Sequence, residues 1–452
     1  MATLDITAKD FIRGESSADY VADGGFSPDS YAINLTKTRG VLYFNEGYTD
    51  RGAATLTGNI IASAIDPSAS GKDAYFLDDE GAFYYIDGGT LTKPQDSASS
   101  FILGTSELFP FNGNLYATSE DSLHQLSGSA LTDCERLWGA ALATGYRHPI
   151  ERVEDEMFVA SQNVIYYLNN AGVTGTAFTL PIGVGVTSLR RHPDGRTLLA
   201  FTSDNAQNFS HTLGGAGKVY YCDPTVRDWV REVQLEAQVE GTRVVGGVVY
   251  CTYGFNFGFF DGNGLQPIKS LDTSATTYSH NISNIEDILL VRDGLNVRAY
   301  GDLGAGNVWW NITNNETNTQ NVNCIHYLGD NKLLFAFSDA GTAGLLKEVD
   351  FDNAGTSGVF YSNRINFGEE VHIHRIDILH DVSAAAGTTR FILSYRDIDG
   401  TLSTIQDTTY SSQSVNKTRI RANIKTDIFQ LKLTQSNDDT GYKLIRIFYD
   451  PV

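Results

Sequence analysis

Short apolar runs come in pairs along this chain, and each pair is joined by a turn rich in Gly, Asp or Asn. The chain contains seven such pairs in succession, and the first is Ala74–Leu77 with Ala82–Ile86. Their first runs are centred on Tyr75, Tyr116, Phe158, Leu199, Tyr250, Leu290 and Phe335, at intervals of 41, 42, 41, 51, 40 and 45 residues. Short apolar runs bounded by turn residues are typical of strands. Because one small sheet cannot bury both faces alone, this period predicts an all-β fold with a β-propeller of about seven blades.

The two ends of the chain depart from the repeat. Residues 1–55 hold few apolar runs, so we expect an irregular arm that packs on the C-terminal domain or on a neighbouring subunit. The propeller is expected over 56–352, and a Gly-, Asn- and Ser-rich stretch, Phe351–Gly358, marks its end. Residues 353–452 alternate apolar and polar positions over about six short strands, which predicts a C-terminal antiparallel β-sandwich.

Two local patterns lie inside the repeat. His192-Pro193-Asp194-Gly195 leads into an apolar strand and resembles the turn of WD40-like and TolB-like blades. The longest interval contains Ser203–Gly217, a polar, Gly-rich stretch that we interpret as a protruding loop. For Trp229–Glu240 the pattern leaves helix and strand equally open.

Composition and charge narrow the function classes. The chain has 452 residues, 41% of them hydrophobic, which is more than one core usually accommodates and favours two domains. Its formal charge of −21 disfavours a nucleic-acid reader or a peripheral membrane protein, but suits a channel through which DNA slides without being held. No apolar run approaches 18 residues, so we expect a soluble chain made in a reducing cytoplasm, with no membrane partner.

Metal and cofactor chemistry has little support in the sequence. The four cysteines form no C-x-x-C pair, and we expect the thiols in strand patterns, Cys222 and Cys251, to be small buried hydrophobes. His372 and His374 would share one strand face, with His380 nearby, but a zinc site needs further ligands. We expect no metal and no cofactor.

Acidic clusters are the main candidate site residues. They are Asp78, Asp79 and Glu80, then Glu154, Asp155 and Glu156, with Glu286-Asp287 as a weaker case. Paired carboxylates could act as the acid and base of a glycosidase. The favoured interpretation is solvated turns beside blade hairpins, which collectively could line a channel and repel DNA. The usual hydrolase, nucleotide-binding and metalloprotease motifs are absent.

An aromatic stretch offers a second kind of candidate. Tyr253, Phe255 and Phe257, followed by Phe259 and Phe260, could stack on sugars. Because aromatic residues at strand spacing usually pack in a core, we favour a structural role for them.

The overall layout resembles the tail hub or nozzle family of short-tailed bacteriophages. The local features that carry the resemblance are Ser30–Leu35 followed by Gly40–Phe44, and the strand pair Ile428–Thr434 with Leu444–Tyr449. The resemblance implies a structural virion protein without catalysis that forms a hexameric ring. It would contact the tail tube above and fibres or a needle below, while genomic DNA passes through.

Two other functions stay open. A propeller glycosidase or virion depolymerase would bring two or three carboxylates together at the central pocket. A carbohydrate-binding or capsid-decorating module would instead use exposed aromatic side chains on its loops.

Overall fold

The computed structural model describes most of the chain, and strands dominate it. The described residues are 1–11, 30, 33–35, 43–44, 49–51, 56–65, 73–96, 106–127, 130–133, 142–204, 216–271, 282–303, 306–313, 321–329, 332–339, 342–350, 357–382, 389–396, 401–410, 417–436 and 440–452. Within these ranges one short helix occurs, α1 (Ala8–Phe11). None of the helical segments described is long or apolar enough to span a bilayer.

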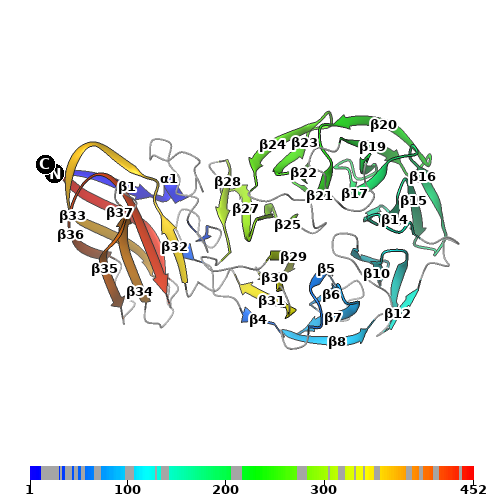
Figure 1. Cartoon of the computed structure of the whole chain (residues 1–452), viewed down its shortest axis with the longest axis horizontal. Helices are drawn as coiled ribbons and strands as arrows, with labels where there is room; N and C mark the ends of the chain where they lie inside the picture. Colours follow the sequence, from blue (N-terminus) through cyan, green and yellow to red (C-terminus); the bar gives the residue numbers. More distant parts are fainter. Residues whose placement is uncertain are drawn as a thin grey trace. The chain divides into compact units, whose positions relative to one another are not determined.

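Seven four-stranded antiparallel sheets form the blades of a propeller, numbered here in ring order (Figure 1). Blade 1 consists of β5 (Ile60–Ala64), β6 (Ala74–Asp78), β7 (Ala82–Asp87) and β8 (Thr90–Asp96). Blade 2 consists of β9 (Leu108–Phe111), β10 (Asn114–Thr118), β11 (Leu123–Ser127) and β12 (Ala130–Asp133). Blade 3 consists of β13 (Ile150–Val153), β14 (Glu156–Ser161), β15 (Val164–Asn169) and β16 (Thr174–Thr179). Blade 4 consists of β17 (Gly185–Arg191), β18 (Leu198–Ser203), β19 (Gly217–Asp223) and β20 (Asp228–Leu235).

The remaining blades repeat the same strand order. Blade 5 consists of β21 (Val239–Val245), β22 (Val248–Tyr253), β23 (Asn256–Phe260) and β24 (Leu265–Ser270). Blade 6 consists of β25 (Ile282–Ile285), β26 (Ile288–Asp293), β27 (Asn296–Asp302) and β28 (Asn307–Asn311). Blade 7 is β29 (Asn321–Gly329), β30 (Lys332–Asp339), β31 (Thr342–Asp350) and, from the N-terminal part of the chain, β4 (Thr49–Asp50).

The first strand of each blade lies innermost, and these seven strands close a ring. Each contacts the first strand of the next blade, and β29 of blade 7 contacts β5 of blade 1. The early strand β4 completes blade 7, so segments from opposite ends of the repeat share one sheet. Arg51 fastens this closure, because its guanidinium donates two hydrogen bonds of 2.8 Å to Glu348 and its backbone N–H donates to Leu346.

The predicted strand pairs are the two middle strands of each blade, which confirms the propeller of about seven blades. β6 pairs with β7 and β18 with β19, and the other five pairs match in the same way. The middle strands carry the continuous apolar runs because neighbouring blades cover both of their faces. All six residues of β18 are buried, whereas the outer strand β20 has several exposed positions.

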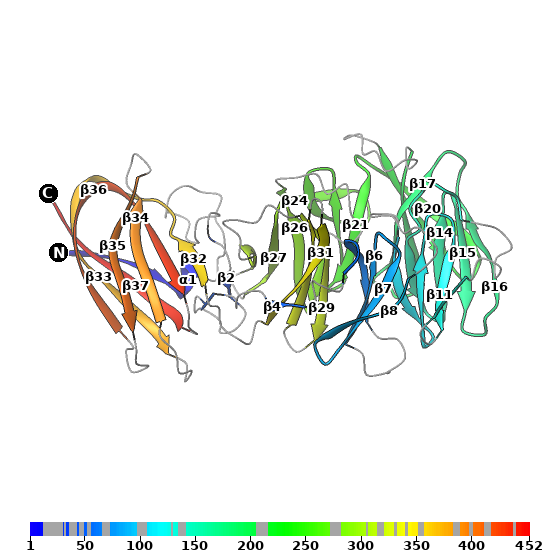
Figure 2. The same cartoon turned by 60° about the horizontal axis from the view of Figure 1, so that its bottom comes forward.

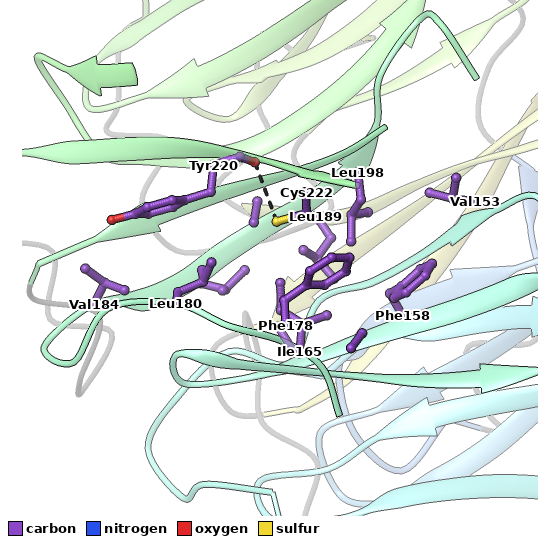
Figure 3. Packing of buried hydrophobic residues seen from close by; sticks show 14 residues of the cluster. Val153, Phe158, Ile165, Phe178, Leu180, Val184, Leu189, Leu198, Tyr220 and Cys222 are labelled. Carbon is purple, nitrogen blue, oxygen red and sulfur yellow. Dashed lines mark hydrogen bonds between the residues drawn. The ribbon is translucent and has the colours of Figure 1, made fainter. Parts of the chain in front are cut away.

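Apolar side chains fill the space between blades. Figure 3 shows the cluster between blades 3 and 4, where Phe158 and Phe178 pack with Leu198 and Tyr220. Cys222 lies in the same cluster, and its thiol makes one weak contact with the carbonyl oxygen of Tyr220 at 3.9 Å. Burial raises the pKa of this thiol to about 12.

The ambiguous stretch Trp229–Glu240 is strand throughout its regular part. It contributes most of β20 and the start of β21. The stretch was ambiguous because β20 is an outer strand with one solvated face, so its apolar positions are too sparse to define a period. Most of the expected loop over 203–217, namely 205–215, lies outside the described residues.

A second body of antiparallel strands follows the propeller. The chain divides into two compact units, one of residues 1–49, 296–318 and 349–452 and the other of 50–295 and 319–348, so the division runs through blade 6. The strands after the propeller are β32 (Ser357–Tyr361), β33 (Ile365–Val382), β34 (Thr389–Arg396), β35 (Leu402–Tyr410), β36 (Lys417–Ser436) and β37 (Thr440–Pro451).

Strand β36 belongs to two groups of strands. Its first half pairs with β33, and its second half pairs with β32 and β34. The sequence predicted separate strands at Lys417–Ile424 and Ile428–Thr434, but the single strand β36 covers both, and its partner changes between Phe429 and Gln430. Ile420 and Ile424 are buried in the first half, and Leu431 and Leu433 in the second.

Both chain ends lie in this unit (Figure 2). β1 (Ala2–Thr7) pairs antiparallel with β37, with Ala2 opposite Tyr449 and Thr7 opposite Leu444. Phe11 is fully buried and packs edge-on against Phe360. The two short strands β2 (Ile33–Asn34) and β3 (Tyr43–Phe44) also pair. Thr49–Asp50 was expected in the arm but belongs to blade 7, and most of the remaining arm is outside the described residues.

Candidate functional site

A pocket of about 400 Å³ lies among the described residues of the propeller. It lies where inner strands of blades 3 to 6 end. Its lining is Glu151, Arg190, Arg191, His192, Pro193, Gly195, Arg243, Val244, Gly247 and Asn284. Most of these groups are polar or charged, so the pocket suits a hydrophilic ligand better than an apolar one.

The wall of the pocket is a hydrogen-bonded network across three inner strands. The guanidinium of Arg190 donates to Glu151 Oε2 at 2.9 Å and to Thr242 Oγ1 at 3.0 Å. Thr242 Oγ1 in turn lies 2.7 Å from Ser188 Oγ. These bonds link blades 3, 4 and 5 and hold the Arg190 side chain in one direction.

Arg243 completes the basic lining. Its Nε donates to Asn284 Oδ1 at 2.7 Å, which ties blade 5 to blade 6. Burial and then the positive charge of Arg190 lower the pKa of Arg243 to about 10. Arg191 is exposed at the pocket mouth and has no ion-pair partner among the described residues. The pocket therefore places three guanidinium groups beside a single lining carboxylate.

A second carboxylate lies close by. Glu107, at the start of blade 2, accepts a hydrogen bond of 3.0 Å from the backbone N–H of Ile150, the residue before Glu151. Burial raises the pKa of Glu107 to about 7, and the charge of Glu151 contributes to that shift. Two neighbouring carboxyl groups thus differ in environment, one desolvated and the other ion-paired with Arg190.

The prediction of a solvated turn is wrong for Asp78. Its side chain is fully buried, and its carboxylate accepts hydrogen bonds from four groups. These donors are the hydroxyls of Thr57 and Tyr84 and the backbone N–H groups of Gly58 and Ala82. Asp78 ends a middle strand, where the next turn needs an acceptor for its inward N–H groups. Asp78 therefore has a structural role, and it is not one of the solvated acids that could line a channel.

The neighbouring acids in this cluster behave differently. Asp79 accepts from the backbone and side-chain nitrogens of Asn59, and Glu80 is exposed. In the second cluster Glu154 and Asp155 are exposed, and Asp155 lies 3.8 Å from the guanidinium of Arg152, while Glu156 is ion-paired with Arg227.

The two acidic clusters do not share one rim of the propeller. Asp79 and Glu80 lie in the turn between the second and third strands of blade 1. Glu154 and Asp155 lie in the turn between the first and second strands of blade 3. Successive turns of an antiparallel sheet fall at opposite edges. Glu154 and Asp155 are therefore on the rim that carries His192, Pro193 and the pocket mouth.

The aromatic stretch is mostly core. Tyr253 and Phe257 are buried, and the ring of Phe257 stacks on that of Tyr250. Phe255, in the turn between them, is 41% exposed and is the one member of the proposed contact set that could meet a ligand.

The described part of the chain contains no candidate metal-binding site. There, no group of three His, Cys, Asp or Glu side chains converges. The rings of His372 and His374 do lie together, 4.1 Å apart, but each is hydrogen-bonded elsewhere, to Asn423 and Asp450. Cys222, Cys251 and Cys324 are free and buried, as expected for strand thiols, and Cys134 is outside the described residues.

Sequence reasoning missed the pocket. Its key residues, Arg190 and Arg243 among them, lie on the inner strands, which are less apolar than the middle pair and gave no signal in the repeat. A weak signal existed in Thr187-Ser188-Leu189-Arg190 and Thr242-Arg243-Val244, where a polar side chain interrupts a strand pattern.

Comparison with known proteins adds no family. No family profile and no curated protein matches the sequence. The Pan2 WD40 domain of Neurospora crassa is a similar solved structure, with a TM-score of 0.43 and 11% identity over 65% of this chain and 89% of that one. The Dos1 propeller gives a TM-score of 0.42 and 10% identity over 68% of this chain and 94% of that one. The propeller fold is defined by the sheet order of this chain itself.

Proposed function

We propose that this protein is a structural, non-catalytic component of a bacteriophage tail, a nozzle-like ring through which genomic DNA leaves the virion. One observation carries the proposal: β1 pairs with β37, so the propeller is inserted in the sequence between strands of a single β unit. The resemblance to tail nozzle proteins rests on an irregular N-terminal segment, a central propeller and a β-rich C-terminal platform. Of the local features that carried the resemblance, Ile33–Asn34 and Tyr43–Phe44 do pair, whereas Ile428–Thr434 and Leu444–Tyr449 are separated by β33.

Sheet edges give a physical route to assembly. In the strand order of the β unit, β1 and β35 are the terminal strands. An edge strand presents unpaired backbone N–H and C=O groups, to which a strand of another subunit can add. Joining one kind of edge to another is a head-to-tail contact, which closes into a ring when the rotation is suitable.

The charge of the chain supports passage of DNA. With a formal charge of −21, the surface repels phosphate groups. Glu80, Glu154 and Asp155 are exposed and stay candidates for the channel lining, although they lie on two different rims. Ion pairing of Glu156 and burial of Asp78 leave those two little part in repulsion.

Native mass spectrometry and light scattering test the assembly. We expect a discrete ring, six subunits by the resemblance, alone or with tail-tube protein. Leu402, on the edge strand β35, is 46% exposed, and Leu402→Glu should weaken the ring because charged edges resist pairing. Val230→Glu, on a propeller outer strand, is the matched control. A strictly monomeric wild type under both conditions contradicts the proposal.

A second candidate function is favoured by one observation. Glu107 is desolvated and Glu151 is ion-paired with Arg190, so their environments differ as those of a glycosidase acid and its nucleophile or base do, although Glu107 does not line the pocket. Incubation with capsular and other acidic polysaccharides, followed by reducing-end assay, tests it. Turnover by the wild type and its loss in Glu107→Gln would favour a depolymerase over a passive nozzle.

A further inference from the structure

We propose that the pocket of blades 3 to 6 binds a hydrophilic organic anion of about monosaccharide size, through the guanidinium groups of Arg190, Arg191 and Arg243. This binding is separate from the structural role proposed above. It needs neither a ring nor a catalytic step.

Local charge is the first argument. The chain carries an excess of acidic residues, yet the pocket lining holds three arginines against one glutamate. Glu151 is already paired with Arg190 at 2.9 Å. Arg191 and Arg243 form no direct ion pair with a lining carboxylate, although the charge of Glu151 acts on Arg243 from a distance, so an entering anion would add a direct partner.

The surroundings of Arg243 are the second argument. Arg243 is partly desolvated and lies near Arg190, and both effects disfavour its charge, as the lowered pKa shows. Its hydrogen-bond partner is the neutral amide oxygen of Asn284. Such an arrangement costs stability unless a negative group neutralises it, and guanidinium forks suit carboxylate and phosphate oxygens.

Size and lining define the ligand class. A volume of about 400 Å³ is at the lower end for small-molecule sites and fits a sugar acid or a sugar phosphate. Pro193 and Val244 supply a small apolar surface, and His192 and Asn284 can meet hydroxyl groups. A lipid would find too little apolar lining here.

Thermal unfolding and calorimetry at constant ionic strength test the site. The probes are glucuronate for a carboxylate, glucose 6-phosphate and inorganic phosphate for phosphate, and glucose as the neutral control. We expect one or both of the charged sugars to raise the unfolding temperature of the wild type and to bind with a stoichiometry of one. Glucose should do neither.

Two variants separate ligand binding from folding. Arg243→Gln should weaken binding at least about tenfold, since it removes a charge-assisted contact. Its unfolding temperature without ligand should change little, because the loss of the hydrogen bond to Asn284 is offset by relief of the repulsion from Arg190. Arg196→Gln, on the turn beside the pocket but outside its lining, should bind like the wild type.

Three outcomes overturn the proposal. The first is that no charged probe binds at 10 mM, about the concentration at which affinity becomes negligible. The second is that glucose and the anions have equal effects. The third is that Arg243→Gln and Arg196→Gln lose binding affinity equally. A response to inorganic phosphate alone, without either sugar, would show an adventitious anion contact and would also refute an organic ligand.

Discussion

The buried carboxylate of Asp78 gives the sharpest test of the structure. Replacing it by Asn keeps the shape of the side chain but removes the charge and one acceptor. Three donors meet Oδ2, at 2.9 Å from Thr57, 3.0 Å from Gly58 and 2.8 Å from Tyr84, and the N–H of Ala82 meets Oδ1 at 2.6 Å. If the amide oxygen takes the Oδ2 position, its NH₂ group faces the N–H of Ala82, and two donors are left opposed.

The cost follows from these bonds. Hydrogen bonds to a charged group contribute about 1.5–3 kcal/mol each. Asp78→Asn loses one of them outright and weakens three others, so we expect a loss of about 2–4 kcal/mol. At about 2 °C per kcal/mol for a domain of this size, the unfolding temperature should fall by roughly 4–8 °C.

Differential scanning calorimetry measures this shift, with Glu80→Gln as control because Glu80 is exposed on the same turn. Hydrogen exchange should also show faster exchange of the Gly58 and Ala82 amides in Asp78→Asn, and no change in the control. If Asp78→Asn unfolds within about 1 °C of the wild type, or no lower than the control, the buried network is not formed as described.

Four further substitutions probe the core and the buried Glu107 close to the pocket. Phe257→Ala should cost about 3–5 kcal/mol in unfolding experiments and Phe255→Ala less than about 1, because Phe257 is buried and Phe255 is not; equal effects would contradict the packing. Glu107 has a folded pKa near 7 against an ordinary 4.5, so the folded state holds its proton more tightly and stability should fall as pH rises from 4.5 to 7. A calorimetric pH series should show a shallower fall for Glu107→Gln, and an unchanged slope would refute the shift. Cys222→Ser should lose about 1–3 kcal/mol by placing a hydroxyl in an apolar cluster, and the native thiol should resist alkylation at pH 8; rapid labelling would contradict its burial.

The repeat was visible in the sequence because the middle strands of a blade are buried on both faces. Their apolar runs, such as Leu198–Ser203, need no pairing partner to be recognised. The period of the C-terminal strands was equally plain, and their local alternation predicted β33 and β37. Outer and inner strands carry mixed patterns, which is why β20 was ambiguous.

Burial of individual polar residues could not be predicted. Asp78 and Glu80 lie in one short acidic run, yet Asp78 is fully buried and Glu80 is exposed. The difference depends on donors from Thr57 and Gly58, about twenty residues earlier in the chain. A charge run reports average solvation of a turn and says nothing of which carboxylate points inward.

The amino-acid order by itself determined the number of blades, their strand chemistry and the switch to a second β region, since these depend on local runs of apolar and turn residues. The tertiary structure alone decided that β4 closes the ring, that β1 joins β37, and that Arg190 and Arg243 meet beside Glu151. Those contacts join residues far apart in the chain. Their formation depends on how the blades stack around the axis, which local sequence does not encode.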